Sequence, residues 1–286
     1  MSRIVYVNGA YLPEEQAKIS VFDRGFLFAD GVYEVSSVLC GKLIDNEGHL
    51  ARLHRSLSEL DMATPASDAE IETIQKTLIA KNGVDQGLVY LQVTRGAADR
   101  DFAYPQGVAP SLVMFTQNKN VIDSPQARNG IAVIGVEDIR WRRRDIKSVG
   151  LLAPCMAKMQ AKAAGADDAW LVEDGYVTEG SSSNAFIVSA EGVLITRQLG
   201  NEILAGITRK AVLKLAQEQQ LEIEQRPFSI EEACNASEAF ITSATTFVMP
   251  VVSIDGNPIA DGKPGRLTRR LRELYIQAAL DSVDEA

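Results

Sequence analysis

The stretch Arg140-Trp141-Arg142-Arg143-Arg144-Asp145-Ile146-Lys147-Ser148 separates an apolar run typical of a strand, at 131–136, from an Ala-rich run typical of a helix, at 151–164. A second polar stretch, Glu179-Gly180-Ser181-Ser182-Ser183-Asn184, follows in the same half of the chain. An amine and a carboxylate that each stand at the junction of two elements are the groups needed to hold an aldehyde cofactor through an imine. The two stretches therefore predict an enzyme that uses pyridoxal phosphate.

Predicted strands and helices alternate along the first 118 residues. Asn8-Gly9 stands between two short apolar runs and is a strong signal of a hairpin turn. The predicted strands are 4–7, 10–12, 32–39, 43–44, 88–94 and 112–116, and the predicted helices are 46–61 and 68–82. Helices gathered beside consecutive strands favour an α+β fold over a doubly wound parallel sheet.

A polar segment without periodicity, 119–130, interrupts this pattern and predicts a linker. We therefore expect an N-terminal α+β domain over 1–118 and a C-terminal, cofactor-binding domain over 131–286. The second domain is predicted to contain strands at 131–136, 169–172, 176–178, 186–188, 193–196 and 239–243 and helices at 151–164, 207–220 and 266–280. A chain of 286 residues is long enough for two such domains.

Composition and charge disfavour several classes of protein. The chain is 46% hydrophobic and 23% charged, close to the average for soluble globular proteins, and its formal net charge is −9. A negative surface repels nucleic-acid phosphate and anionic lipid, so neither nucleic acid nor a membrane is an expected partner. No apolar run reaches the roughly 18 residues of a membrane span, and the first residues lack the apolar core of a signal peptide. We expect a cytoplasmic protein.

Histidine and cysteine spacing disfavours a metal site and a hydrolase. His49 and His54 both lie on the predicted helix 46–61, about 140° apart around its axis, which is poor geometry for one metal ion. No Gly-x-Ser-x-Gly motif accompanies them, so a Ser-His-Asp hydrolase is disfavoured as well. The cysteines have neither metal-ligand nor disulfide spacing and are interpreted as buried or spare thiols: Cys40, Cys155 and Cys234.

The residues around the two polar stretches suit imine chemistry. Lysine is nucleophilic when neutral, and we expect the arginines of 140–144 to favour that form by crowding Lys147 with positive charge. Glu179 is followed by a glycine and three hydroxyls, whose backbone can turn tightly around a ligand. A carboxylate beside a pyridine nitrogen favours the protonated ring, which is the better electron sink. For each motif taken alone, an exposed lysine and a simple polar turn are the alternatives.

A phosphate site is predicted at the start of the helix 207–220. Leu204-Ala205-Gly206-Ile207-Thr208-Arg209 leads into that helix, where the amides of Ile207 and Thr208 and the Thr208 hydroxyl can face an anion at the positive helix end. An ordinary threonine cap explains the same residues equally well. Arg52, on the predicted helix 46–61, is a further candidate for the phosphate, with a solvent-exposed role as its alternative.

Seven blocks of sequence follow one another along most of the chain. They are Phe22-Asp23-Arg24-Gly25-Phe26, Asp30-Gly31-Val32-Tyr33-Glu34, Val93-Thr94-Arg95-Gly96, Val136-Glu137-Asp138-Ile139-Arg140-Trp141, Asp145-Ile146-Lys147-Ser148, Thr178-Glu179-Gly180-Ser181-Ser182-Ser183-Asn184 and Gly206-Ile207-Thr208-Arg209. Together these blocks resemble the class IV pyridoxal-phosphate aminotransferases, and within them the D-amino-acid aminotransferases most. The resemblance implies the two-domain α+β fold of that family and a homodimer.

The resemblance also implies which residues bind the cofactor. Lys147 would form the imine with pyridoxal 5'-phosphate and move the α-proton of the substrate, and Glu179 would pair with the pyridine nitrogen. The other implied cofactor ligands are Arg52, Ser182, Ile207, Thr208 and Ala244. The family commonly has Thr where Ala244 stands, so a phosphate hydroxyl is missing although the backbone amide remains. Ser243 and Thr245 are the candidates to supply a hydroxyl instead.

The implied substrate-binding residues are Tyr33, Arg100 and Phe102. Tyr33 and Arg100 match family positions that bind the α-carboxylate of the substrate, Arg100 through two parallel charge-assisted hydrogen bonds. A packed strand aromatic and a surface arginine are the alternatives when each is taken alone. Phe102 stands where the D-amino-acid enzymes often have His, so a polar partner of the carboxylate is absent.

The implied reaction is a ping-pong transamination without a metal. A D-amino acid, with D-alanine and D-glutamate as the expected examples, would give its amino group to a 2-oxo acid such as 2-oxoglutarate or pyruvate. Three enzymes of the same fold remain alternatives: a branched-chain aminotransferase, an (R)-amine transaminase and, less favoured, aminodeoxychorismate lyase. A non-catalytic binding module that uses the phosphate site alone is the alternative from another class.

Overall fold

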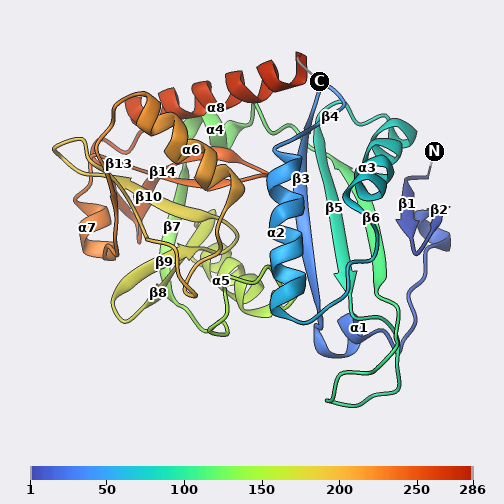
Figure 1. The fold of residues 1–286 in the computed structure, drawn as a ribbon. Coiled ribbons are helices and arrows are strands. Elements are labelled where there is room, and N and C mark those ends of the chain that lie inside the picture. The colour runs from blue at the N-terminus through green and yellow to red at the C-terminus, as the bar shows by residue number, and fades with distance from the viewer. Residues whose placement is uncertain (1, 285–286) are drawn as a thin grey trace. The chain divides into compact units, whose positions relative to one another are not determined.

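The chain folds into two compact units in the computed structural model, which describes residues 2–284 (Figure 1). Unit 1 comprises Met1–Asn120, Ile146–Gly150 and Ser282–Ala286, and unit 2 comprises Val121–Asp145 and Leu151–Asp281. Residues 146–150 thus pack with unit 1, whereas the sequence predicts them in the C-terminal domain. The domain boundaries drawn from the sequence stay a prediction. In the described part of the chain, no helix combines the length and the apolar character of a membrane span.

Unit 1 is built on a six-stranded antiparallel sheet in the order β2-β1-β6-β5-β3-β4. Its strands are β1 Ile4–Val7, β2 Ala10–Pro13, β3 Gly31–Leu39, β4 Lys42–Ile44, β5 Gly87–Thr94 and β6 Ser111–Asn118. Asn8 and Gly9 both have positive φ and form the predicted turn between β1 and β2. β5 pairs along its whole length with β3 and β6, so these three strands form the rigid middle of the unit.

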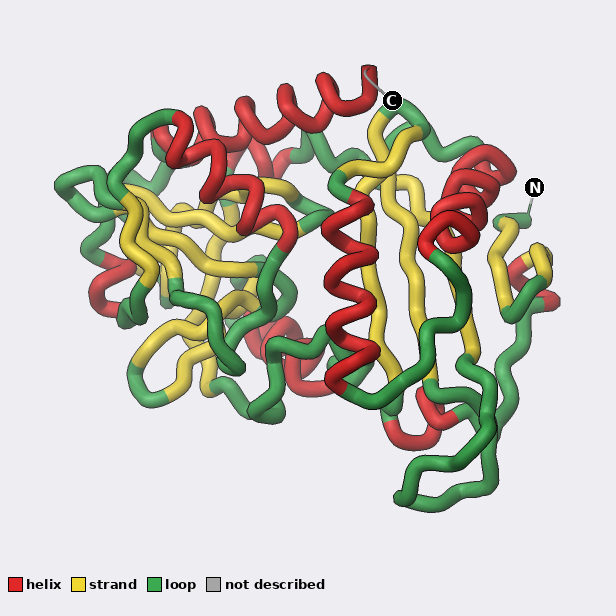
Figure 2. The backbone as a smooth tube through the Cα atoms, in the orientation of Figure 1, coloured by secondary structure: helices red, strands yellow, loops and turns green. Residues whose placement is uncertain are grey.

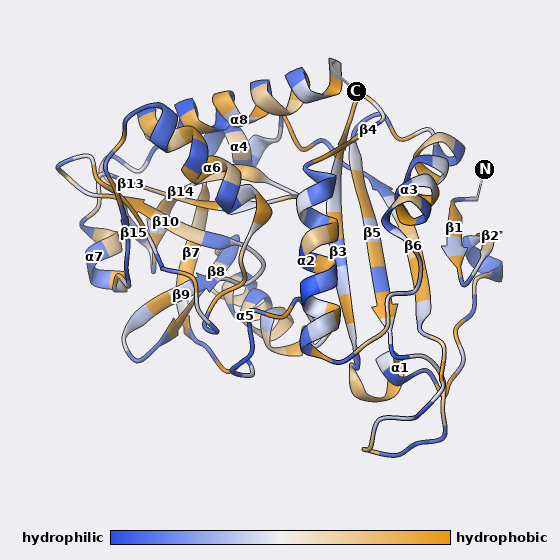
Figure 3. Ribbon diagram, in the orientation of Figure 1, coloured by the Kyte–Doolittle hydropathy of each residue, from blue (hydrophilic) through white to orange (hydrophobic). Residues whose placement is uncertain are grey.

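Two helices, α2 Asn46–Glu59 and α3 Asp68–Asn82, pack on this sheet through the apolar stripes that the sequence predicts (Figure 1). Figure 3 shows hydrophobic residues on β3 and β5, and both hydrophobic and hydrophilic residues along α2. The shared core includes Val32, Leu50, Leu53, Leu57, Ile71, Ile74, Leu78, Leu91, Val93 and Met114. Ser67 and Glu70 form a capping box at the start of α3, and Gly83 ends it in the left-handed conformation. Two short helices complete the unit: η1 Glu14–Gln16 and α1 Arg24–Phe28.

The segment Ile146–Gly150 runs antiparallel to the start of β3. The Tyr33 amide donates to the Lys147 carbonyl over 3.0 Å, and the Val149 amide donates to the Gly31 carbonyl over 3.0 Å. Ile146 is 3% exposed and joins the core under α2. Backbone hydrogen bonds and one buried side chain therefore fix the position of Lys147 in unit 1.

Unit 2 contains a mixed nine-stranded sheet in the order β12-β11-β10-β13-β14-β7-β8-β9, with β15 paired to β14. Its strands are β7 Ile131–Glu137, β8 Asp168–Glu173, β9 Tyr176–Gly180, β10 Asn184–Val188, β11 Leu194–Thr196, β12 Ile223–Gln225, β13 Glu238–Ser243, β14 Phe247–Ile254 and β15 Asn257–Pro258. β7 pairs in parallel with β8 and β14, and β11 with β12. Glu179 is the second-last residue of β9, just before the turn 181–183 that leads to β10.

The helices of unit 2 are α4 Pro125–Asn129, α5 Leu152–Ala163, α6 Ile207–Glu218, α7 Ile230–Cys234 and α8 Arg266–Asp284, whose last residues belong to unit 1. Strand residues such as Trp170, Ile187 and Ile241 fill the main core, and Ala157 and Ala161 pack α5 on β7 and β8. On α8 the buried Arg272 donates to four carbonyls, those of Val121, Ile122, Thr246 and Val248. These bonds hold the turn before β14 in place.

Several elements are not in the sequence prediction: the short helices η1, α1, α4 and α7 and the strands β12, β14 and β15. α4 lies inside the predicted linker 119–130, because the Ser124 hydroxyl caps a helix that Pro125 begins. α1 and α7 are single turns, too short to show a periodicity. β14 contains Pro250, which in a sequence counts against a strand inside a sheet. The longer elements of the prediction are confirmed.

Candidate functional site

Lys147 lies against Tyr33 in unit 1. The Lys147 Nζ is 4.2 Å from the centroid of the Tyr33 ring. The Lys147 amide donates to the Ser56 hydroxyl over 3.3 Å, which attaches the same residue to α2. The Tyr33 ring stacks on that of Tyr90, at 5.6 Å between centroids, and Tyr90 on that of Phe115, at 4.6 Å. The three stacked rings come from paired strands, so the Tyr33 ring that contacts the lysine side chain is held in a fixed position.

Arg52 forms a buried cluster with Glu34 and His49. Its Nε and Nη2 donate to the two oxygens of Glu34, each over 2.8 Å, and the His49 Nδ1 is 2.8 Å from the Glu34 Oε2. Burial raises the pKa of Glu34, but the charge and hydrogen bonds of Arg52 and His49 outweigh burial and hold that pKa at about 2. A solvent-exposed role for Arg52 is therefore wrong. The two-point contact fixes the plane of the guanidinium.

Arg100 lies on the long loop that joins β5 to β6 (Figure 2). Its guanidinium carbon is 5.3 Å from the centroid of the Phe28 ring and 5.4 Å from that of Phe102, which is 77% exposed. Phe102 thus supports the arginine by cation–π contact in place of a polar partner. Arg100 and Phe102, both predicted to bind the substrate, are therefore in contact with each other in the structure.

The family block around Asp30 anchors this loop, a role that its sequence alone does not reveal. The Asp30 Oδ2 accepts from the Nε of Arg24 over 2.7 Å and from the Nε of Arg95 over 2.8 Å. Arg24 in turn donates to the Asp101 carbonyl over 2.6 Å, and the Arg95 guanidinium lies 3.5 Å from the centre of the Tyr104 ring. One largely buried carboxylate therefore holds two arginines that tie the loop to the sheet.

Glu179 is buried in unit 2, and both of its carboxylate oxygens have partners. The Oε1 accepts from the Nη1 of Arg140 over 2.5 Å, and the Oε2 accepts from the Asn184 side chain over 3.0 Å and the Leu204 amide over 3.2 Å. Burial raises the pKa of Glu179, and Arg140 opposes that effect without cancelling it. The carboxylate is thus fixed in space and retains more affinity for a proton than an ordinary glutamate.

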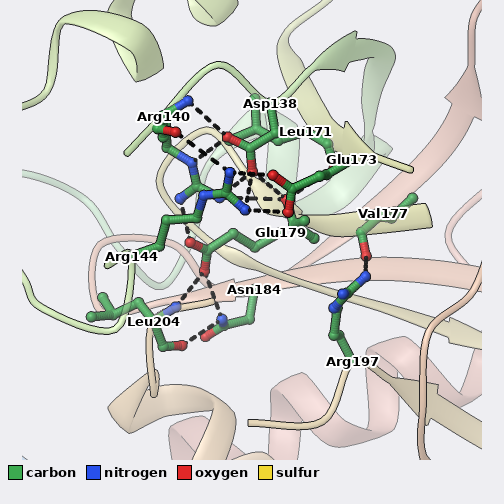
Figure 4. Close-up of polar contacts among 11 residues, drawn as sticks. Asp138, Arg140, Arg144, Leu171, Glu173, Val177, Glu179, Asn184, Arg197 and Leu204 are labelled. Atoms are coloured by element: carbon green, nitrogen blue, oxygen red, sulfur yellow. Dashed lines mark hydrogen bonds and ion pairs between the residues drawn. The ribbon is translucent and has the colours of Figure 1, made fainter. Parts of the chain in front are cut away.

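Arg140 belongs to a larger ionic network that Figure 4 shows. Its Nε and Nη2 donate to the two oxygens of Asp138, over 2.9 and 2.7 Å, and Asp138 also accepts from the Thr178 hydroxyl over 2.7 Å. Arg144 makes a two-point contact with Glu173, over 2.7 and 2.8 Å, and lies 3.6 Å from Asp138. Two guanidiniums and three carboxylates therefore meet in a largely buried space.

Three of the four arginines that are expected to crowd Lys147 are paired with carboxylates. Arg140 and Arg144 are neutralised within the network, and Arg143 makes a two-point contact with Asp145. The expectation counts the arginines alone, although Asp138 and Asp145 flank the run in the sequence. Glu173 is distant in the chain, and folding brings it to Arg144.

The start of α6 is joined to Glu179. The Asn184 side chain donates to the Leu204 carbonyl over 2.9 Å as well as to Glu179, and a Cβ on Gly206 would lie 2.0 Å from the Asn184 Oδ1. Gly206 is the N-cap of α6 and offers no side chain to the first-turn amides. Thr208 stands inside the first turn, so an ordinary threonine cap is ruled out. These features leave an uncapped, positive helix end close to a buried carboxylate.

The turn Ser243–Thr246 gathers hydroxyls next to Ala244. The Ser243 hydroxyl is 2.7 Å from that of Thr246 and 3.4 Å from that of Thr245. Phe247 follows with φ 58°, the left-handed region, although it is fully buried. A non-glycine residue in that region costs free energy and is typical of functional sites.

The three serines after Glu179 point in different directions. Ser181 donates to Asp168 over 2.5 Å, Ser182 is exposed, and the buried Ser183 hydroxyl has no hydrogen-bond partner among residues 2–284. The Thr242 hydroxyl, beside the turn Ser243–Thr246, is likewise buried without a partner in that range. Buried polar groups of this kind are expensive unless a ligand or water meets them.

The predicted residues thus divide between the units. Lys147, Tyr33, Arg52, Arg100 and Phe102 belong to unit 1, and Glu179, Ser182, Ile207, Thr208 and Ala244 belong to unit 2. Among residues 2–284, no three histidine, cysteine or acidic side chains gather as metal ligands. The three cysteines are free thiols, and none is fully buried. The interpretation of them as buried thiols is therefore wrong.

Comparison with known proteins identifies the family of the chain. The family model for class IV amino-transferases matches residues 31–254. The D-alanine aminotransferase of Bacillus licheniformis is 40% identical over 268 residues, 94% of each chain, and that of Staphylococcus aureus strain N315 is 38% identical over 94% of this chain and 95% of its own. The solved branched-chain aminotransferase of Thermoproteus uzoniensis with norvaline has a TM-score of 0.88 at 25% identity, covering 98% of this chain and 96% of that one. This chain belongs to the class IV aminotransferases.

Proposed function

We propose that the protein transfers the amino group of a D-amino acid to a 2-oxo acid. D-alanine and D-glutamate are the expected donors, and 2-oxoglutarate and pyruvate the expected acceptors. The observation that carries this proposal is the 40% identity with a D-alanine aminotransferase over 94% of both chains. Family membership makes the protein an aminotransferase that depends on pyridoxal 5'-phosphate.

Unit 2 has the groups that such a cofactor requires. The uncapped first turn of α6 offers the amides of Ile207 and Thr208 to a phosphate, and the turn at Ala244 adds a backbone amide. Glu179 offers a fixed carboxylate to a pyridine nitrogen. The hydroxyls of Thr242 and Ser183, which are buried without a partner among residues 2–284, support a ligand in this part of the fold. The residues present therefore fit the cofactor.

Lys147 is the proposed catalytic amine. Pyridoxal phosphate, when bound, supplies the carbonyl that takes the amino group and the ring that accepts the electrons of the broken Cα–H bond. The Tyr33 ring and the backbone bonds to β3 hold Lys147 in place, so its Nζ can carry a proton to and from the substrate α-carbon. Arg52, fixed by Glu34, is the proposed guanidinium for the phosphate, and Ser182 a further cofactor contact.

Arg100 is the proposed anchor of the substrate carboxylate, together with Tyr33. The exposed guanidinium rests on two phenyl rings, which lets it offer its N–H groups to a carboxylate. Phe102 adds no hydrogen bond of its own, so recognition of the carboxylate depends more on Arg100 than it does where a histidine stands. We further propose a homodimer located in the cytoplasm.

Steady-state rates with three donors test the proposed substrate class. D-alanine, L-leucine and (R)-1-phenylethylamine, each with 2-oxoglutarate, separate the D-amino-acid, branched-chain and (R)-amine readings. We expect kcat/KM to be highest for D-alanine. A higher kcat/KM for L-leucine would support the second candidate, which the likeness to the branched-chain enzyme of Thermoproteus uzoniensis favours.

A further inference from the structure

The guanidinium of Arg140 makes only one of its hydrogen bonds to Glu179. The Nε and Nη2 of Arg140 form a two-point contact with Asp138, and only the Nη1 reaches Glu179 (Figure 4). The Asp138 side chain is fully buried, so its charge is not screened by water. Arg140 is therefore a shared cation: Asp138 fixes its orientation, and its charge acts on both Asp138 and Glu179.

The remaining contacts of Asp138 hold that division in place. Thr178 donates to the Asp138 Oδ2 and lies one residue before Glu179 on β9, so the two carboxylates are positioned by the same strand. Arg144 approaches Asp138 at 3.6 Å but directs its own two-point contact to Glu173. Asp138 therefore remains the partner of the Nε and Nη2 of Arg140, the two-point contact that is called the fork of Arg140 below.

A further cation acts on Glu179 within unit 2. Arg209, on the first turn of α6, is the further cation near it, and the Arg209 side chain donates to the Arg197 carbonyl and the Gln225 side chain. Asn184 and Leu204 provide neutral hydrogen bonds. The three carboxylates of the network exceed its two guanidiniums by one negative charge, and Arg209 acts on Glu179 from outside the network.

We propose that Asp138 and Arg140 are a positioning pair that sets how strongly Glu179 holds a cationic ring nitrogen. This inference rests on the proposed role of Glu179. By fixing Arg140 through its fork, Asp138 orients the Nη1 toward Glu179 and also limits the positive charge that Glu179 receives. Arg140 favours the ionised form of Glu179, and Asp138 limits how far Arg140 neutralises it, so that the carboxylate still attracts a pyridinium.

Two binding constants, measured on the cofactor-free protein, test the pair. One is for pyridoxal 5'-phosphate, and the other is for its analogue in which carbon replaces the ring nitrogen. Both carry the same aldehyde and phosphate, so the ratio of the two affinities isolates the interaction with the nitrogen. In the native protein we expect a preference for the nitrogen-containing ring that disappears as the pH falls through the pKa of Glu179. The midpoint of that loss is the quantity to compare.

The two members of the pair should shift this midpoint in opposite directions. Arg140→Gln removes the cation and should raise the midpoint by about one pH unit or more, and Asp138→Asn removes the competing anion and should lower it. Arg140→Lys keeps the charge and should return the midpoint most of the way. Arg226→Gln is the matched control: this arginine of unit 2 is also ion-paired, with Glu224 and Glu232, and should leave the midpoint unchanged.

The outcomes separate the inference from the proposed function. Glu179→Gln should abolish the preference for the ring nitrogen; if the preference survives, the proposed role of Glu179 is wrong. If Glu179→Gln abolishes it but Arg140→Gln and Asp138→Asn leave the midpoint where it was, or shift it in the same direction, the positioning pair is wrong. Should Arg140→Gln fail to fold, the comparison of Asp138→Asn with Arg140→Lys decides the same point, since only the first should lower the midpoint.

Discussion

Units 1 and 2 each bury a glutamate against an arginine, yet the two carboxyl groups behave differently. In unit 1 the fork of Arg52 and the His49 ring both serve Glu34, and together they outweigh burial, so its pKa falls to about 2. In unit 2 the fork of Arg140 serves Asp138, and burial raises the pKa of Glu179. An arginine partner therefore does not by itself fix the charge of a buried carboxylate: Glu34 has a two-point contact with Arg52 and a second partner in His49, whereas Glu179 has one contact with an arginine that it shares with Asp138.

The difference matches the roles proposed for the two glutamates. Glu34 is fully satisfied by Arg52 and holds it in position, which is a structural task. Glu179 is fixed in space but incompletely neutralised, which suits a carboxylate that has to bind a cation.

The largest effect should separate these roles in turnover. Glu179→Gln should lower kcat with D-alanine and 2-oxoglutarate on the order of 10²- to 10³-fold, because the ring nitrogen loses its anionic partner. Glu34→Gln should lower kcat at saturating cofactor by less than about tenfold, since Glu34 acts only through Arg52. Equal losses in the two variants would remove the distinction.

A second comparison measures the stability of the cofactor-free protein in urea. Arg52→Gln leaves the carboxylate of Glu34 buried without its cation and should cost about 3–5 kcal/mol of unfolding free energy. Arg140→Gln should cost less, because Glu179 takes up a proton more readily and Asp138 keeps Thr178 and Arg144. Arg55→Gln, an exposed arginine of α2, is the control and should change stability by less than about 0.5 kcal/mol. A larger cost for Arg140→Gln would contradict this order.

The pH dependence of stability should have opposite signs for the two glutamates. Glu34, whose pKa is lowered in the fold, contributes stability that is present above its unfolded pKa and lost as the pH falls toward about 2, on the order of 3 kcal/mol. Glu179, whose pKa is raised in the fold, favours the folded state at low pH and loses that contribution as the pH rises through its folded pKa. The difference in unfolding free energy between the native protein and Glu34→Gln, native minus variant, should rise with pH. The corresponding difference for Glu179→Gln should fall, and a common sign would refute the comparison.

The smallest effect concerns the strand that links Asp138 to Glu179. Thr178→Val removes a hydrogen bond to a buried carboxylate and should cost about 2 kcal/mol. Thr196→Val is a matched control in the same unit, where the hydroxyl donates to the neutral Ala185 carbonyl, and should cost about 1 kcal/mol. Thermal unfolding of the cofactor-free variants measures both, and a cost for Thr178→Val no greater than that of the control would argue against a charged acceptor.

The longer elements of both units could be predicted because their signals are local. The leucine stripe of α2 and the Asn8-Gly9 turn each act within a few residues, and both are present in the structure. β14 could not be predicted, because Pro250 counts against a strand in the middle of a sheet. The position of this strand is set by its pairing with β13 and β7. The helix inside the predicted linker shows the same limit, since one capped turn carries too little periodicity.

The candidate site follows a similar division. Lys147 and Glu179 stand in motifs that the sequence displays. Gly206-Ile207-Thr208 indicates a phosphate site or a threonine cap at the start of α6, and only the structure removes the cap. The charge balance could not be predicted, because Asp138 and Arg140 meet Glu179 only after β7, β8 and β9 pair. A run of arginines therefore indicates positive charge in the sequence but gives neutralised pairs in the fold.

Borohydride reduction of the protein loaded with pyridoxal 5'-phosphate tests the central claim most directly. Peptide mapping by mass spectrometry should find the pyridoxyl group on the Nζ of Lys147, and Lys147→Ala should remove both that label and turnover. Attachment at another lysine, or full turnover by Lys147→Ala, would contradict the account.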